Sequence, residues 1–108
     1  MIKRRTKTPI REPSDDGATI IRIPLTRGKF AIIERDDWEY IKRVGSPNAF
    51  ADRSHFGRVY AAVWTGRRNE MIARILLKAK RGQRVRYSNG DTLDLRRANL
   101  SLVGGSVQ

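Results

Sequence analysis

Residues 20–33, with the sequence IIRIPLTRGKFAII, contain two short apolar segments separated by a turn. In the first segment Ile21, Ile23 and Leu25 recur at every second position, which predicts a strand with one buried face. Residues 26–29 include a glycine that can adopt a positive φ angle, which favours a turn. The second segment, residues 30–33, predicts another strand, and we expect the two strands to pair as a hairpin.

A helix is expected directly after this hairpin. Trp38, Ile41 and Val44 recur at helical spacing and predict one apolar face. Asp36, followed three residues later by Glu39, is typical of a capping box, so we expect Asp36 to cap the helix. The acidic start and the basic end of this segment also suit the helix macrodipole.

The remainder of the chain alternates apolar segments with turn signals, which predicts short elements. In chain order they are a loop at 49–56, a third strand at 58–64, a basic hairpin tip at 65–69, a short strand at 70–72, a helix at 73–80, a strand at 84–87, a turn at 88–91, a short helix at 94–100 and a strand fragment at 102–103. In the short helix, Leu95 and Ala98 are expected to face inward.

Residues 1–18 differ from the rest of the chain because they have no periodic apolar pattern. Their two prolines, one glycine and five basic side chains are typical of a flexible basic arm. A length of 108 residues fits one small domain or two very small lobes that share a core. We therefore expect lobes at 19–72 and 73–108 that form one compact unit.

The net charge of +12 is the strongest compositional signal, and residues 65–108 contribute +7 of it. A short and strongly basic chain favours a polyanionic partner, which predicts DNA binding with RNA as the alternative. Binding to an acidic protein is the other interpretation of the same charge.

Other features of the composition narrow the class of protein. The chain has no cysteine, so disulfides and thiolate zinc sites are excluded. Its longest apolar runs, such as residues 61–64, are too short to span a bilayer, and no apolar segment follows the basic N-terminus. We expect a cytoplasmic protein with no membrane contact and no cofactor.

Two stretches of the sequence resemble one family. IPLTRGKFAII at 23–33 and DDWE at 36–39 are similar to the N-terminal lobe of phage HNH endonucleases, a lobe that is itself similar to the AP2 DNA-binding domain. Val85, NGD at 89–91, LD at 93–94, RR at 96–97 and NL at 99–100 resemble the HNH core of that family. The resemblance covers residues 20–108 and implies an α+β fold. In this fold an AP2-like three-stranded antiparallel sheet with a helix precedes an HNH-like ββα element.

The sequence departs from this family at the catalytic positions. In active members a His is the general base, an adjacent Asp and a later Asn or His bind the metal, and a middle Asn orients the base. Arg86 stands at the Asp position and Tyr87 at the His position, while Gln108 lies near the distal ligand position. Asn99 matches the orienting Asn. A guanidinium does not ligate a cation, and a phenol with a pKa near 10 is a poor base at neutral pH, so we expect no catalysis and no metal.

Other residues of this region also differ from active members. Leu95 replaces an Asn, and Ala73-Arg74 replaces a His-Arg pair. The remaining carboxylates, Asp91 and Asp94, are interpreted as turn and helix-cap residues. The single histidine, His55, does not match the HNH His and is interpreted as a surface or packing residue.

The candidate nucleic-acid-binding residues are basic side chains expected on the outer strands, the hairpin tip and the HNH-like element. They are Arg22, Arg27, Lys29, Arg58, Arg67, Arg68, Lys78, Lys80, Arg81, Arg84, Arg86, Arg96 and Arg97. The resemblance implies that the AP2-like sheet lies in the major groove, where Arg pairs with guanine. Arg97 also has a structural interpretation, because family members have Arg there. Trp64 and Tyr60 either contact nucleic acid or pack in the core.

Three functions follow from these observations. The first is a non-enzymatic DNA-binding protein of phage or prophage origin, built on an HNH endonuclease scaffold, that regulates or occludes a site. The second is a phage inhibitor that binds a host nuclease or defence complex through its basic surface. The third is a residual endonuclease with a rebuilt metal site near Asp91 or Asp94.

Overall fold

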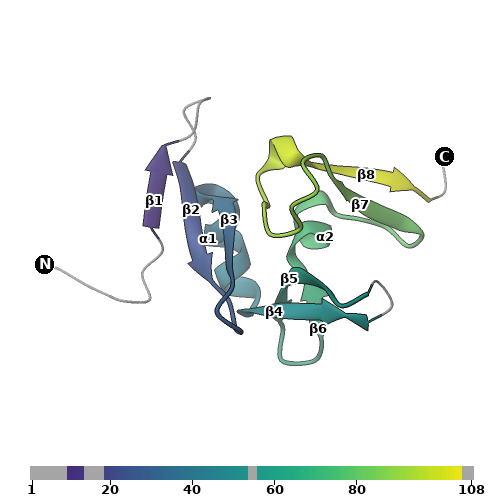
Figure 1. Cartoon of the computed structure of the whole chain (residues 1–108), viewed down its shortest axis with the longest axis horizontal. Helices are drawn as coiled ribbons and strands as arrows, with labels where there is room; N and C mark the ends of the chain where they lie inside the picture. The colour runs from purple at the N-terminus through teal and green to yellow at the C-terminus, as the bar shows by residue number, and fades with distance from the viewer. Residues whose placement is uncertain (1–9, 14–18, 54–55, 106–108) are drawn as a thin grey trace, which may run out of the picture.

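The computed structural model describes residues 10–13, 19–53 and 56–105, which form an α+β fold with small antiparallel sheets (Figure 1). The first sheet precedes helix α1 (Arg35–Val44) and consists of β1 (Ile10–Pro13), β2 (Thr19–Pro24) and β3 (Phe30–Glu34). The second sheet precedes helix α2 (Ile72–Leu77) and consists of β4 (Ser46–Asp52), β5 (Arg58–Trp64) and β6 (Asn69–Met71). The third pairs β7 (Gln83–Tyr87) with β8 (Leu100–Gly104), which follows the short 3-10 helix η2 (Arg97–Asn99).

The β2–β3 hairpin forms as the sequence predicts. Ile21 pairs with Ile33 and Ile23 pairs with Ala31, and all four side chains are buried. The turn between the strands places both Arg27 and Gly28 at positive φ, at 62° and 70°. Two consecutive residues of this kind match the right-handed twist of the paired strands, which explains a tight turn at this point.

The arm expected at 1–18 contains a strand. Residues 10–13 form β1, which pairs antiparallel with β2 and brings Ile10 opposite Arg22. The prediction of a flexible arm is therefore wrong for these four residues, because the outer edge of β2 offers backbone groups that complete a third strand. The rest of the predicted arm, residues 1–9 and 14–18, lies outside the described residues.

Helix α1 has the predicted apolar face but not the predicted cap. Ile41 is fully buried, and Trp38 and Val44 pack against the core. The helix begins at Arg35 with Glu34 as N-cap and has no side-chain cap hydrogen bond, so the prediction that Asp36 caps it is wrong. The reason is that β3 runs into α1 without a loop, which places Asp36 inside the first turn.

The second sheet differs most from the sequence prediction. Residues 58–64 form a strand as expected, but this strand pairs with β4 and β6 and belongs to a sheet separate from the β2–β3 hairpin. Strand β4 takes up the first half of the expected loop at 49–56. Gly45 permits the pairing of β4 with β5, because any larger residue would clash there. A Cβ atom at residue 45 would lie 1.9 Å from the carbonyl oxygen of Trp64.

The third sheet is close to the prediction, but its flanking segments need two corrections. Helix α2 ends at Leu77, where Lys78 takes a φ of 53°, so it is shorter than the expected helix at 73–80. The expected helix at 94–100 is also wrong, because only η2 is helical. Residues 93–95 lie beside β3 instead. There the N–H of Ile32 donates to the carbonyl of Leu93 (3.0 Å), and the N–H of Leu95 donates to the carbonyl of Ile32 (2.8 Å).

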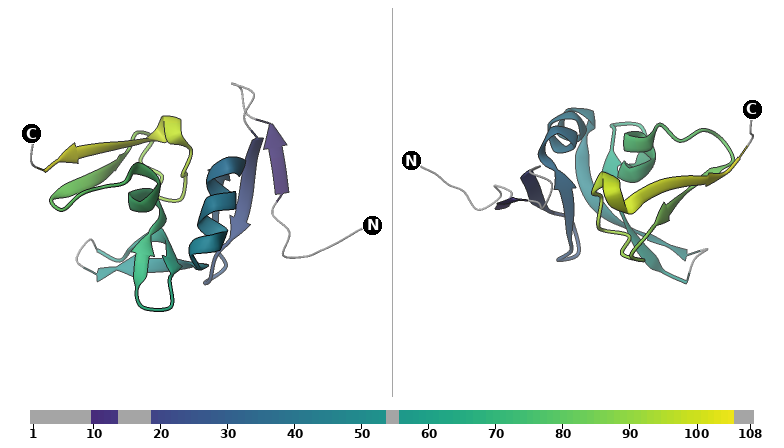
Figure 2. Two further views of the ribbon diagram at one scale, coloured as in Figure 1. Left: turned by 180° about the vertical axis from the view of Figure 1, so that it is seen from behind. Right: turned by 90° about the horizontal axis from the view of Figure 1, so that it is seen from above.

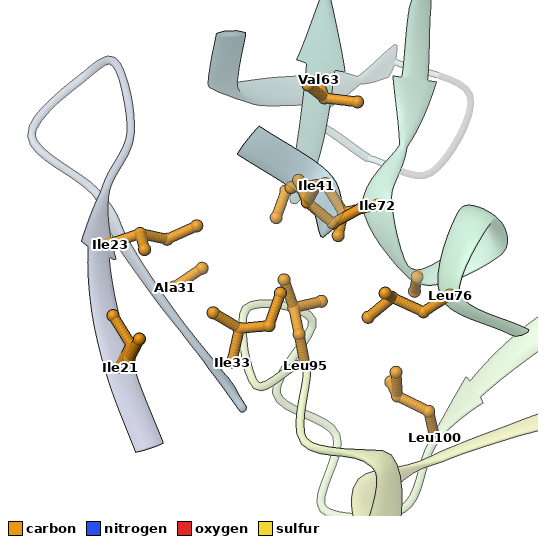
Figure 3. Close-up of a cluster of buried hydrophobic side chains, with 12 residues drawn as sticks. Ile21, Ile23, Ala31, Ile33, Ile41, Val63, Ile72, Leu76, Leu95 and Leu100 are labelled. Atoms are coloured by element: carbon orange, nitrogen blue, oxygen red, sulfur yellow. The ribbon is translucent and has the colours of Figure 1, made fainter. Parts of the chain in front are cut away.

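Leu95 lies in the middle of the hydrophobic core. Its side chain is fully buried, as expected, whereas Ala98 is exposed and does not face inward. Figure 3 shows Leu95 beside Ile33 of β3, with Leu76 of α2 and Leu100 of β8 on its other side. This one core joins the three sheets, and no helix in the described ranges is long and apolar enough to cross a membrane.

Replacing Leu95 with alanine removes the side chain that joins the sheets and leaves a cavity. We expect Leu95→Ala to lower the free energy of unfolding by about 3 kcal/mol. Equilibrium urea unfolding measures the change. Leu102→Ala, at a half-buried position of β8, is the control and is expected to lower the free energy of unfolding clearly less than Leu95→Ala does. Equal losses in the two variants would contradict the central position of Leu95.

Candidate nucleic-acid interface

A hollow of about 450 Å³ lies between the second sheet and the β7–β8 hairpin. The pairing register places Asp52, Arg58, Tyr60 and Met71 on one face of the second sheet, and this face lines the hollow. Arginines are the main polar residues of its wall. The lining residues are Asp52, Arg58, Tyr60, Met71, Arg74, Arg84, Val85, Arg86, Tyr87 and Val103. We call this site the arginine hollow.

The four arginines of the hollow are held in different ways. Arg58 donates from Nη2 to the carbonyl of Gly90 (3.2 Å), and Arg74 donates from Nη2 to the carbonyl of Lys80 (3.2 Å). Arg84 and Arg86 alternate on β7, both are exposed, and neither forms an ion pair with a described carboxylate. Their charge therefore remains available to an anionic ligand.

Two further hollows continue the arginine hollow along the surface. The adjoining one shares Met71 and Arg74 with it and is also lined by Arg68 and Lys78. The last lies at the β5–β6 tip and shares Arg68 with its neighbour. Together we call these three sites the basic groove. Its charged lining consists of seven basic and two acidic side chains, which are Arg58, Arg67, Arg68, Arg74, Lys78, Arg84, Arg86, Asp52 and Glu70.

Tyr87 lies at the position where the resemblance implies the general base. Burial raises the pKa of Tyr87 to about 12, nearby Tyr60 adds to the shift, and Arg58 opposes it. The two tyrosine rings are tilted against each other with centroids 6.2 Å apart. The phenol of Tyr87 therefore stays protonated at neutral pH, which makes it a still weaker base than an exposed tyrosine.

Asn99, at the position of the orienting Asn, holds the loop between β7 and β8. Its buried side chain donates from Nδ2 to the carbonyl of Asp94 (2.9 Å) and accepts from the N–H of Asn89 (2.9 Å). These bonds tie the turn after β7 to the segment that lies beside β3. Gln108 and His55 lie outside the described residues, so the structure does not place them.

The carboxylate of Asp94 is occupied by hydrogen bonds. It accepts from Nε and Nη2 of Arg96 (2.9 and 2.7 Å) and from Nδ2 of Asn89 (2.9 Å). Asp91 accepts from the N–H of Leu93 (2.9 Å), as a turn residue does. Across the described ranges, no three His, Asp or Glu side chains come together in a group that could hold a metal ion.

Arg96 and Arg97 were predicted to bind nucleic acid, but the structure pairs both within the chain. Arg96 contacts Asp94 as described above. Arg97 donates from Nε and Nη2 to the carboxylate of Asp37 (2.8 and 3.0 Å), and this ion pair raises the pKa of Arg97. Asp37 lies in the first turn of α1, so the pair fixes the C-terminal loop to this helix.

The other predicted residues lie apart from the hollow. Arg22, Arg27 and Lys29 are exposed on the β2–β3 hairpin, and Figure 2 shows β1 and β2 at the opposite end of the molecule from the end of β8. Arg22 lies over the ring of Phe30, 4.1 Å from its centroid. Lys80 and Arg81 are exposed in the connection between α2 and β7.

Sequence reasoning missed Arg74 as a site residue. Its sequence signal is the resemblance itself, because Arg74 is the retained member of the His-Arg pair. Arg84 and Arg86, which were predicted as nucleic-acid-binding residues, lie two positions apart on β7 and are both exposed. No protein-family model matches the chain, and no curated protein or solved structure is significantly similar to it.

The Asp94 network predicts a loss of stability in acid. Burial disfavours the carboxylate, but hydrogen bonds from Arg96 and Asn89 outweigh burial and lower the pKa of Asp94. A lowered folded pKa contributes stability above the unfolded pKa of about 3.9, and this stability is lost as the pH falls through the folded pKa.

The variant that tests this network is Asp94→Asn. We expect it to cost about 2 kcal/mol at neutral pH, because the buried carboxylate no longer accepts charge-assisted hydrogen bonds from Arg96 and Asn89. Between about pH 5 and about pH 2, the difference in unfolding free energy between Asp94→Asn and the unchanged protein should shrink as the pH falls, because the stabilising carboxylate is lost between its unfolded and its lowered folded pKa. A difference that stays constant over this range would refute the assigned role of the carboxylate. Urea unfolding at each pH measures it.

Proposed function

We propose that this chain is a non-catalytic DNA-binding protein that holds phosphates in its basic groove. The observation that carries the proposal is the arginine hollow, which is lined by Arg84 and Arg86 of β7 and by Arg58 of the second sheet. Guanidinium groups bind phosphate oxygens with paired hydrogen bonds, so several of them around one hollow suit a nucleic-acid backbone.

The distribution of charge supports a polyanionic ligand. In the basic groove, basic side chains outnumber acidic ones by seven to two, and one of the two acids, Glu70, already pairs with Arg68 (2.9 Å). Arg96 and Arg97 are paired elsewhere, which concentrates the available positive charge in the groove. A DNA backbone that neutralises these cations would release its counterions.

The proposal extends to the origin of the scaffold. The β7–β8 hairpin, with its NGD turn and Asn99, would correspond to the HNH core, and the first sheet with α1 would correspond to the AP2-like lobe. In this interpretation Arg86 replaces a metal ligand with a phosphate-binding cation, and Tyr87 replaces the base with a protonated phenol. Such a protein, of phage or prophage origin, would occlude or regulate a DNA site without cutting it.

A salt-titrated binding assay tests the proposal. We expect the logarithm of the DNA-binding constant to fall linearly with the logarithm of the salt concentration. The slope should have a magnitude of about 0.7 to 0.9 for each neutralised phosphate. Arg84→Gln and Arg86→Gln should each weaken binding several-fold and reduce that slope by about 1. Arg43→Gln, which removes an exposed cation from α1, is the matched control. If neither single-stranded nor duplex DNA binds at low salt, the proposal fails.

The proposal also predicts that the protein leaves DNA intact. Plasmid and single-stranded DNA should remain uncut with Mg²⁺ or Mn²⁺, because Tyr87 does not accept a proton at neutral pH. Gel electrophoresis after prolonged incubation measures this. Cleavage that EDTA abolishes, and that is lost in Asp91→Asn or Asp94→Asn, would contradict it.

A further inference from the structure

The face of the second sheet that lines the arginine hollow also has two exposed aromatic side chains. The pairing register places Phe50 opposite Tyr60 and Trp64 opposite Ser46, on the same face as Arg58. Phe50 is 40% exposed and Trp64 is 50% exposed, which is unusual for side chains of this size. We use the name aromatic face for Phe50, Trp64 and the side chains that lie between them on this face of the sheet, which are Asn48, Tyr60 and Ala62.

Two asparagine side chains on this face are held in place by hydrogen bonds to each other. Asn48 and Asn69 exchange side-chain hydrogen bonds (2.8 and 3.0 Å). Asn48 is on β4 and Asn69 is on β6, so the pair crosses over the central strand β5. Ala62, the β5 residue opposite Asn48, is accordingly buried. The aromatic face is therefore a fixed surface with an aromatic side chain toward each end.

Cations border the aromatic face at both ends. Arg58 and the arginine hollow lie next to Tyr60, and Arg67 and Arg68 lie at the β5–β6 tip that follows Trp64. The floor of the hollow adds apolar surface from Met71 and Val85. Exposed aromatics between groups of cations provide stacking surfaces for bases and anchoring points for phosphates.

We infer that the aromatic face and the arginine hollow together bind single-stranded DNA in preference to duplex DNA. This inference rests on the proposed function and names the form of DNA that the basic groove takes. A duplex conceals the faces of its bases within the stack, so Phe50 and Trp64 gain no stacking partner from it. An unpaired strand exposes those faces, and its phosphates can reach Arg58, Arg84 and Arg86.

Competition between two forms of one sequence tests the inference. The probes are a mixed-sequence strand of about 20 nucleotides and the duplex that it forms with its complement, compared at the same salt concentration. We expect the unchanged protein to bind the single strand at least about tenfold more tightly. Because this comparison uses no variant, it does not depend on how any substitution folds.

Variants then assign the preference to the aromatic face. Trp64→Leu and Phe50→Leu keep apolar surface but remove the stacking ring, and each should weaken single-strand binding about tenfold while duplex binding changes less than about twofold. Trp64→Tyr should restore most of the affinity. Tyr40→Leu, which removes an aromatic side chain of 56% exposure from α1, is the matched control.

The possible outcomes separate the inference from the proposed function. Tighter duplex binding, or single-strand binding that Trp64→Leu and Phe50→Leu leave unchanged, overturns the inference while DNA binding itself stands. Binding to neither probe overturns both. Thermal unfolding of each variant shows whether it is folded, and if one leucine variant is unfolded, the other decides the role of the face.

Discussion

Residues 93–95 lie along the outer edge of β3, and the arrangement of the sheets depends on this contact. Two backbone hydrogen bonds with Ile32 satisfy groups that the edge of the first sheet would otherwise leave open. The same contact places Leu95 in the core and leaves Asp94 where Arg96 and Asn89 can bond to it. Asn99 then connects this segment to the turn after β7, so the position of the β7–β8 hairpin, and with it the arginine hollow, follows from the pairing with Ile32.

Those parts of the fold that depend on neighbours in sequence could be predicted. The β2–β3 hairpin, the apolar face of α1 and the turn at 88–91 each have a local signal in spacing or turn chemistry. Strands β1 and β4 lack such a signal, because they form by pairing with edges that only the folded chain provides. The expected helix at 94–100 failed for the same reason, since the backbone of Leu95 bonds to Ile32, a residue far away in the sequence.

Prediction of the site was limited by charge pairing across the fold. Composition indicated an excess of arginine and lysine, and the resemblance pointed to Arg84 and Arg86, which line the hollow. The sequence did not indicate that Arg97 would form an ion pair with Asp37, sixty residues earlier, or that Arg74 would line the arginine hollow. An excess of cations can be counted in a sequence, but only the fold decides which of them are neutralised.

The pairing of Ile32 with residues 93–95 also determines an order of events during synthesis. The first sheet and α1 are complete once residue 44 has been made, yet Ile33 has no Leu95 to pack against until about fifty more residues have followed. Until then the edge of β3 and its apolar side chains are open to other chains. The nascent protein therefore depends on late closure of a long loop, which predicts slow folding and an aggregation-prone intermediate on the ribosome.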